Sequence, residues 1–281
     1  MVRTSFLPSV TIMVFLRFFS GSLMAMSLLC STLVSSTHNP INYSRSPSGP
    51  DRLMPRNVTT RTTWKFGVVL FPKLIILDFQ GPMELLGFLA KGSMVQTSPA
   101  WPFAPYEFEI DYLAETLDPI VPSVGPPIVP SKTFSEVNAT QYDILLVPGG
   151  PGTRPAIISP NVVSFVKQQA PGLQYMLSVC TGAWILANAG VLEGKNATTN
   201  KAAFAQIRNE TSKNINWIPK ARWVVDGTTW SSSGVTAGAD MANAFLTYLA
   251  GPDFATKVRN IVELRAAEQG DDPFAEVYGL I

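Results

Sequence analysis

The stretch that decides the fold is Leu173-Gln-Tyr-Met-Leu-Ser-Val179, followed directly by Cys180-Thr-Gly-Ala-Trp184. The first seven residues form a short apolar run typical of a buried strand, and the next group opens a helix that ends at Gly190. Cys180 therefore stands at a strand-to-helix turn. N–H groups of a first helical turn point toward such a residue, and the helix dipole favours a thiolate. We expect a pKa of about 3.5–7.5 for this thiol, although Cys180 on its own fits a buried, unreactive cysteine equally well.

The same alternation of strand and helix patterns continues on both sides of this turn. Strand patterns cover residues 65–71, 106–114, 142–148 and two short pieces within 222–231. Helix patterns cover residues 81–89, 161–169, 182–189, 238–249 and 253–267. This alternation predicts an α/β fold with a mainly parallel sheet and helices on both faces. In such a sheet the ligand lies at the carboxyl ends of the strands.

The composition excludes several classes of protein. The chain has 281 residues and a net charge of +1, which disfavours a broad nucleic-acid-binding surface. Hydrophobic residues make up 46% and charged residues 15%, a balance that indicates a packed domain and disfavours disorder. One histidine, His38, and two cysteines, Cys30 and Cys180, are too few for an ordinary Cys/His zinc site or a disulfide framework. We therefore expect neither a metal nor a nucleic-acid partner.

The first 63 residues differ from the rest of the chain. Residues 1–37 begin with a positive charge, continue with an apolar stretch and end in small residues, as a secretory signal does. Arg17 interrupts the apolar stretch, so a retained membrane anchor or a misplaced start codon, with a cytoplasmic protein, is an alternative. Residues 38–63 are rich in Ser, Pro and Thr and predict a linker. Residues 64–281 are long enough for one large domain, and we expect a secreted protein.

Asparagines followed two positions later by Ser or Thr agree with a secretory route. Five of the 13 asparagines have this pattern without an intervening proline, whereas chance gives about two. The pattern indicates N-glycosylation, and the alternative is simply a chain rich in threonine. The candidate acceptors are Asn42, Asn57, Asn138, Asn196 and Asn209.

Two further segments carry residues with chemical potential. Val147-Pro-Gly-Gly-Pro-Gly-Thr153 follows a buried strand, and its glycines let the backbone approach a ligand closely. Beside the cysteine turn, the N–H groups of Gly150 and Thr181 are candidates for an oxyanion-type hole. Asp78 precedes a Gly-Pro pair that is typical of a helix start, where an acidic residue is often only a cap. Taken alone, each segment also fits a purely structural role.

Together these motifs resemble the ThiJ/PfpI superfamily, part of the class I glutamine amidotransferase-like group. The resemblance rests on Cys180-Thr-Gly-Ala, on Val147-Pro-Gly-Gly and on Asp78-x-x-Gly-Pro-x-Glu84, and it extends over about residues 64–275. It implies a flavodoxin-like three-layer sandwich, usually a homodimer, without metal or organic cofactor. The isonitrile hydratase branch is the most similar, because an aspartate stands at position 78 where other branches place a glutamate.

The resemblance also implies roles for individual residues. Cys180 would be the nucleophile, Asp78 the acid and base, and Thr181 a hydrogen-bond donor near the reacting carbon. The substrate-binding residues would include Gly81, Gly149 and Gly150 as well. The chain departs from many relatives at Asn200, where they carry a histidine. Asparagine does not move protons near neutral pH, which disfavours chemistry that needs a Cys-His pair.

The function expected on these grounds is hydration of a small isocyanide to an N-substituted formamide. The partner would thus be a small electrophile, and no cofactor would be needed. Two alternatives stand beside it, namely a glyoxalase or deglycase acting on small dicarbonyls, and a non-catalytic redox sensor built on the cysteine. Elsewhere, Trp217, Trp223 and Trp230 are expected to pack in the core, and Asp271-Asp272 is expected to form a solvated turn.

Overall fold

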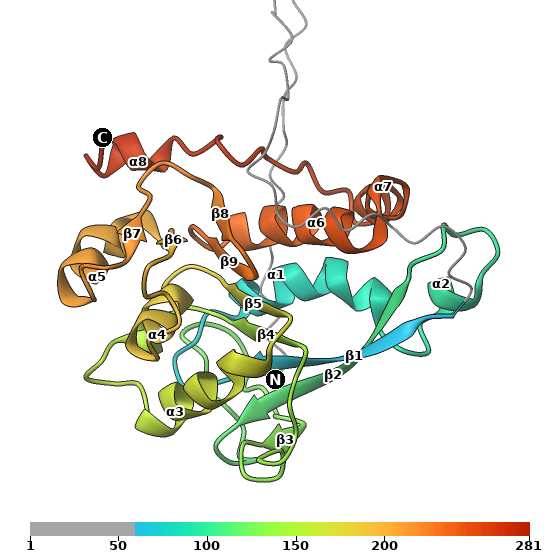
Figure 1. Ribbon diagram of the computed structural model, residues 1–281, viewed down its shortest axis with the longest axis horizontal. Coiled ribbons are helices and arrows are strands. Elements are labelled where there is room, and N and C mark those ends of the chain that lie inside the picture. Colours follow the sequence, from blue (N-terminus) through green and yellow to red (C-terminus); the bar gives the residue numbers. More distant parts are fainter. Residues whose placement is uncertain (1–59) are drawn as a thin grey trace, which may run out of the picture. The chain divides into compact units, whose positions relative to one another are not determined.

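The computed structural model describes residues 60–281, which fold around a seven-stranded sheet in the order β3-β2-β1-β4-β5-β9-β8 (Figure 1). The predicted leader, most of the linker and the candidate acceptors Asn42 and Asn57 lie outside these residues. Within residues 60–281 no helix is both long enough and apolar enough to span a membrane.

All neighbouring strands of the sheet run parallel except β8 and β9, which form an antiparallel pair. The central strands β4 and β5 are buried at every position, because helices cover both faces of the sheet. A separate pair, β6 with β7, lies outside the main sheet. The strands are β1 (Thr62–Val69), β2 (Tyr106–Ala114), β3 (Lys132–Thr133), β4 (Ile144–Val147), β5 (Tyr175–Ser178), β6 (Asn196–Ala197), β7 (Asn216–Trp217), β8 (Trp223–Asp226) and β9 (Thr229–Ser232).

Helices α1 and α6 pack on each other over one face of the sheet, and α3 and α4 lie on the other face (Figure 1). This arrangement is the three-layer sandwich that the alternating pattern predicts. The α-helices are α1 (Ile76–Leu86), α2 (Met94–Thr97), α3 (Pro160–Gln169), α4 (Gly182–Asn188), α5 (Phe204–Glu210), α6 (Ala237–Ala250), α7 (Pro252–Ile261) and α8 (Phe274–Val277). Short 3₁₀ turns are η1 (Gly87–Leu89), η2 (Pro151–Thr153), η3 (Ala170–Gly172) and η4 (Lys201–Ala203).

Two helix boundaries differ from the prediction. Helix α1 begins at Ile76 and contains Pro82, so the Gly-Pro pair lies inside the helix and does not start it. Asp78 consequently belongs to the first turn of α1. Helix α7 ends at Ile261, because Glu263 adopts a left-handed conformation with φ of 52° that breaks the helical path.

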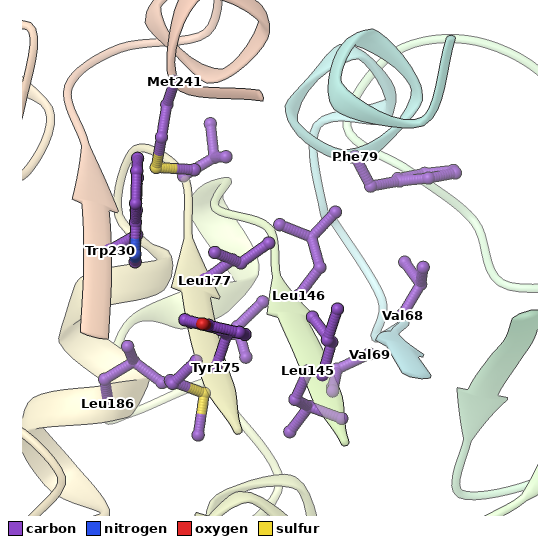
Figure 2. Close-up of a cluster of buried hydrophobic side chains, with 14 of the residues drawn as sticks. Val68, Val69, Phe79, Leu145, Leu146, Tyr175, Leu177, Leu186, Trp230 and Met241 are labelled. Atoms are coloured by element: carbon purple, nitrogen blue, oxygen red, sulfur yellow. The ribbon is translucent and has the colours of Figure 1, made fainter. Parts of the chain in front are cut away.

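The core consists of apolar side chains from the central strands and the helices above and below them. Figure 2 shows Leu145 and Leu177 on neighbouring strands, with Phe79 and Met241 reaching the sheet from α1 and α6. Trp230 packs edge-on against Phe245 with ring centroids 5.1 Å apart, in agreement with its expected packing role.

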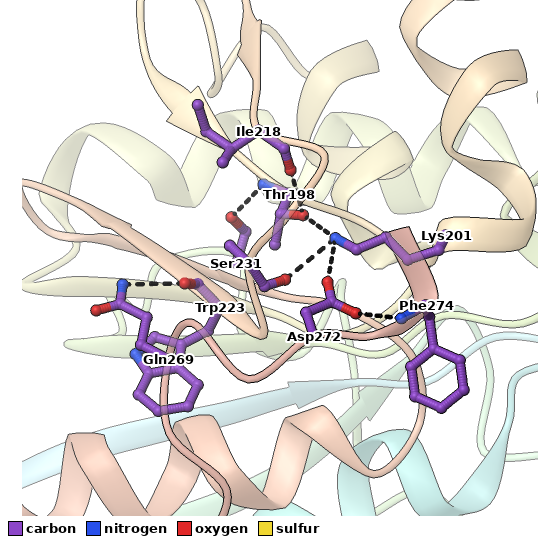
Figure 3. A network of polar contacts seen from close by, with 9 residues as sticks. Thr198, Lys201, Ile218, Trp223, Ser231, Gln269, Asp272 and Phe274 are labelled. Carbon is purple, nitrogen blue, oxygen red and sulfur yellow. Dashed lines mark hydrogen bonds and ion pairs between the residues drawn. The ribbon is translucent and has the colours of Figure 1, made fainter. Parts of the chain in front are cut away.

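The segment after α7 contributes a buried charge. The Asp272 carboxylate and the Lys201 ammonium lie 3.1 Å apart, and neither side chain is more than 2% exposed (Figure 3). The expectation of a solvated turn is therefore wrong for Asp272, although its neighbour Asp271 is exposed. The sequence does not show which of two adjacent aspartates is buried. In the fold, the segment after α7 passes beside η4 and places only Asp272 against Lys201.

Candidate active site

Cys180 lies at the turn between β5 and α4, as predicted, and its backbone is held in an unusual conformation. Its φ is 57°, in the left-handed region that residues other than glycine rarely adopt. The Cys180 N–H donates to the carbonyl of Ser232, the last residue of β9, at 3.2 Å and to that of the next residue, Ser233, at 2.8 Å. The Cys180 carbonyl accepts a bond of 2.9 Å from the Thr199 hydroxyl. Segments from elsewhere in the chain therefore hold this strained turn in place.

Asp78 approaches the cysteine from the first turn of α1. Its side chain is fully buried, and its Oδ2 accepts a hydrogen bond of 2.9 Å from the Gly149 N–H. The thiol of Cys180 faces the same carboxyl group. No group within residues 60–281 makes a hydrogen bond to the other oxygen, Oδ1. The carboxyl group thus has one oxygen fixed by the backbone and one left for chemistry.

Burial controls the protonation of this pair. It raises the pKa of Asp78 from 3.8 to about 7, against the opposing effect of the Gly149 N–H and the thiol. Burial and the adjacent Asp78 charge also raise the pKa of Cys180, although the Thr181 N–H bonds to the sulfur and acts in the opposite direction. The expectation of a lowered thiol pKa is therefore wrong. Helix α4 has only seven residues, and its first turn does not offset a sulfur that is buried beside a carboxyl group.

The glycine turn brings the acid and the cysteine turn together. A Cβ on Gly149 would lie 2.5 Å from the Thr181 nitrogen and 2.9 Å from the Asp78 Oδ2. The Gly150 N–H donates to the Thr181 Oγ1 at 2.9 Å, and that hydroxyl lies 3.2 Å from the Gly150 carbonyl. Of the two N–H groups expected to line an oxyanion hole, that of Gly150 bonds to the Thr181 hydroxyl and that of Thr181 bonds to the sulfur of Cys180.

A Gly149→Ala variant is expected to lose activity at least tenfold in kcat. The added methyl group must displace either the Thr181 backbone or the Asp78 carboxyl, since both lie within 3 Å of it. Steady-state kinetics and thermal unfolding measure the change. Gly87→Ala is the matched control, because Gly87 is helical and nothing lies within 4 Å of its Cβ position. Wild-type kcat in Gly149→Ala would show that this close approach does not matter for the reaction.

Other predicted residues are placed away from the thiol or have structural partners. Gly81 faces Ala239 at the contact of α1 with α6, so it does not join the group around the sulfur. The Asn200 Oδ1 accepts a bond of 3.3 Å from the Ala203 N–H and caps η4, while its amide nitrogen lies beside Gly234. Thr199, Ser232 and Lys201 could not be singled out from the sequence, because none of them belongs to a recognisable local motif.

The candidate glycosylation sites among the described residues are all exposed. Asn138 and Asn209 lie on the surface, as does Asn196. The Asn196 amide is engaged on both sides, with Nδ2 bonding to Asp226 at 2.9 Å and Oδ1 accepting from Asn216 at 2.6 Å. Within residues 60–281 no group of three Asp, Glu, Cys or His residues is arranged to hold a metal ion.

The fold and the site together define a flavodoxin-like α/β protein with a buried cysteine and carboxyl group at the carboxyl edge of its sheet. The model of the DJ-1/PfpI family matches residues 93–248. Isonitrile hydratase of Pseudomonas putida is 32% identical over 208 residues, which cover 74% of this chain and 81% of that relative. The chain therefore belongs to the DJ-1/PfpI family, which confirms the resemblance to ThiJ/PfpI proteins.

Further comparisons agree on the fold and include another activity. A deglycase of Pyrococcus horikoshii is 32% identical over 106 residues, 37% of this chain and 60% of that relative. The crystal structure of a ThiJ/PfpI protein from Pseudomonas syringae has a TM-score of 0.59 at 24% identity, covering 85% of this chain and 92% of that one. Drosophila melanogaster DJ-1beta has a TM-score of 0.58 at 19% identity, covering 72% and 99%. These structures confirm the flavodoxin-like fold.

Proposed function

We propose that this protein is a cysteine-dependent enzyme that hydrates a small isocyanide to an N-substituted formamide. The observation that carries the proposal is the buried pair of Cys180 and Asp78, in which burial raises the pKa of both groups. The single histidine of the chain, His38, lies outside the described residues. A neutral thiol beside a carboxyl group that exchanges its proton near pH 7 suits a substrate that must gain a nucleophile and a proton on one carbon.

In the first step the Cys180 sulfur bonds to the terminal carbon of the isocyanide. The carboxyl group of Asp78 gives its proton to the same carbon, and the thiol proton passes to the carboxylate. The product is a thioimidate, R–N=CH–S–Cys180, and Asp78 is again protonated. The thiol proton is thus transferred to carbon through the carboxyl group, and no free thiolate is required at neutral pH.

In the second step water adds to the thioimidate carbon. Asp78 gives its proton to the nitrogen while taking one from the attacking water, which leaves R–NH–CH(OH)–S–Cys180. Collapse of this adduct breaks the carbon–sulfur bond, and the hydroxyl proton returns to the sulfur through the carboxyl group. The N-substituted formamide leaves and the thiol is restored. Both steps use only protein groups and water.

A deglycase or glyoxalase activity is the second candidate, because deglycases are among the relatives that match at 32% identity. Attack on a dicarbonyl requires a proton to move between two carbons, and the amide of Asn200 cannot carry a proton near neutral pH. The Asn200 oxygen already caps η4. The first step of isocyanide hydration adds the nucleophile and a proton to the same carbon, which a single carboxyl group can serve, and we therefore rank it first.

A direct assay separates these candidates. The purified full chain is mixed under reducing conditions with cyclohexyl isocyanide or, separately, with methylglyoxal, and Cys180→Ala serves as the control. We expect N-cyclohexylformamide with the wild type and none above background with the variant. Lactate from methylglyoxal without formamide would favour the second candidate. Turnover of neither substrate by the reduced protein would contradict both and favour a sensor that responds to oxidation of Cys180.

The proposed chemistry requires Asp78 in its protonated form, which sets the direction of the pH dependence. Because the pKa of Asp78 is raised to about 7, kcat/KM is expected to be level below pH 7. Above pH 7 it should fall about tenfold per pH unit, as the acid is lost. A pH–rate profile of formamide formation measures this. A rate that instead rises through pH 7 would indicate that the ionised carboxylate is the active form, acting as a base.

A further inference from the structure

Two segments hold the strained turn at Cys180, one at residues 198–199 and one at residues 231–233. A polar network joins these two segments. Thr199 contacts the Cys180 carbonyl, and Ser232 and Ser233 contact its N–H. The two segments are connected directly, because the Thr198 N–H donates to the Ser231 hydroxyl at 2.9 Å. A displacement of either segment would therefore change the backbone of the residue that carries the sulfur.

Lys201 holds the Thr198 segment through hydrogen bonds of its ammonium group. Its ammonium donates to the Thr198 hydroxyl at 2.6 Å and to the Ala221 carbonyl at 3.1 Å. The same Thr198 hydroxyl donates to the Ile218 carbonyl at 2.8 Å. Figure 3 shows the Lys201 nitrogen between the Thr198 hydroxyl and the carboxylate of Asp272, which belongs to the C-terminal segment.

Asp272 provides the charge that allows a lysine to be buried here. The two side chains are 2% and 0% exposed, and an ammonium group without a counter-charge would lose its protonated state at such a position. The other carboxylate oxygen of Asp272 accepts from the Phe274 N–H at 3.2 Å, which fixes its orientation. The C-terminal segment thus reaches the cysteine turn through a continuous chain of buried polar contacts.

We propose that Lys201 and Asp272 are positioning residues for Cys180, acting through Thr198 and Thr199. The ion pair keeps the loop from β6 to η4 pressed against the cysteine turn, so that the sulfur stays buried beside Asp78 in the conformation that reacts. The proposal rests on Cys180 being the reacting group of the proposed function. It assigns no contact with substrate to the pair itself.

The test uses the full chain with the double variant Lys201→Met and Asp272→Asn, which removes both charges together, so that neither charge stays buried without its counter-charge. Two rates are measured well below the unfolding temperature: kcat for formamide formation, and alkylation of Cys180 by iodoacetamide, followed on its peptide by mass spectrometry. We expect kcat to fall at least tenfold with KM changed less than threefold. We expect alkylation to become at least tenfold faster, because a released turn exposes the thiol and lets it ionise.

A matched control is available at the same end of the chain. Lys220 and Glu276 form an exposed ion pair of 3.0 Å that also ties the C-terminal segment to the body, without reaching Thr198. The double variant Lys220→Met and Glu276→Gln is expected to leave both rates unchanged. If the buried pair were only structural, its removal would lower the unfolding temperature and leave both rates of the folded protein at wild-type values.

A second variant covers the case in which the double variant does not fold. Thr198→Val keeps the ion pair and removes only the hydroxyl that joins Lys201 to the loop. Like the double variant, it should lower kcat and make the alkylation of Cys180 faster. Wild-type rates in Thr198→Val would overturn the proposal. Alkylation does not depend on the natural substrate, so faster alkylation in an enzyme that forms no formamide would reject the proposed function and retain the positioning role.

Discussion

Replacing Cys180 with serine is expected to lower kcat/KM for formamide formation by about three orders of magnitude or more. Serine nearly preserves the size of the side chain, so the turn and its bonds to Ser232, Ser233 and Thr199 should remain. A hydroxyl is a much weaker acid than a thiol, and a carboxyl group with a pKa of about 7 does not activate it. Steady-state kinetics on protein with an unchanged circular dichroism spectrum measure the loss.

The other cysteine of the chain provides the control for this substitution. Cys30→Ser is expected to retain wild-type kinetics, because the proposed chemistry uses Cys180 alone. A Cys180→Ser protein that keeps its activity within tenfold of wild type would contradict a covalent role for the sulfur. It would point instead to direct addition of water at a site where the thiol is only a neighbour.

Asp78→Asn is expected to lower kcat/KM by about 10²- to 10⁴-fold, the usual contribution of a positioned acid. The amide can still accept the Gly149 N–H through its oxygen, so the site should keep its shape. It cannot supply a proton to the isocyanide carbon or accept one from the thiol. The loss in kcat/KM should be largest below pH 7, where the wild-type carboxyl is protonated, and the fall above pH 7 seen in the wild type should disappear.

The same substitution is expected to stabilise the protein at pH 8. The pKa of Asp78 is raised from 3.8 to about 7, so the folded state binds this proton more tightly than the unfolded chain does. The stability associated with the protonated carboxyl is complete below pH 3.8 and is lost as pH rises through about 7. Asparagine does not ionise and avoids this loss, which is on the order of 4 kcal/mol at 1.36 kcal/mol per pKa unit. Chemical denaturation at pH 8 measures it.

A gain in stability together with a loss of activity would mark Asp78 as a residue kept for function. If Asp78→Asn were less stable than wild type at pH 8 and similar to it at pH 5, the carboxylate would be stabilised by partners that this site does not contain. Retained activity in the variant would remove Asp78 from the mechanism, whatever its effect on stability.

The elements that the sequence predicts well are those with a strong local pattern. Strand β2 has the predicted bounds of 106–114, and the strand-to-helix turn at Cys180 follows from an apolar run ended by Thr-Gly. The sequence pattern places the start of helix α1 five residues too late, because Gly-Pro is a common helix start and the apolar turn before it has no cap signal. Periodicity therefore sufficed for the mainly parallel α/β architecture and for the position of the nucleophile candidate, but not for the order of the strands in the sheet.

The electrostatics of the site could not be predicted, because they depend on what covers the sulfur. The motif around Cys180 favours a thiolate, whereas the folded chain buries the thiol and sets Asp78 against it. The buried state of Asp272 likewise results from a tail that crosses η4, over a sequence separation of about 70 residues from Lys201. The sequence shows which ionisable residues lie near a glycine turn. Only the tertiary packing determines whether those residues are protonated.

The central claim is that Cys180 forms a covalent bond to the isocyanide carbon with Asp78 as the proton carrier. A single-turnover experiment tests it most directly: excess full-length protein is mixed with cyclohexyl isocyanide, quenched in acid at short times and analysed by peptide mass spectrometry. We predict an adduct on the Cys180 peptide equal in mass to one isocyanide molecule, which decays as N-cyclohexylformamide appears and is absent in Cys180→Ser. Formamide appearing in the first turnover while the Cys180 peptide stays unmodified at every time point would contradict the account.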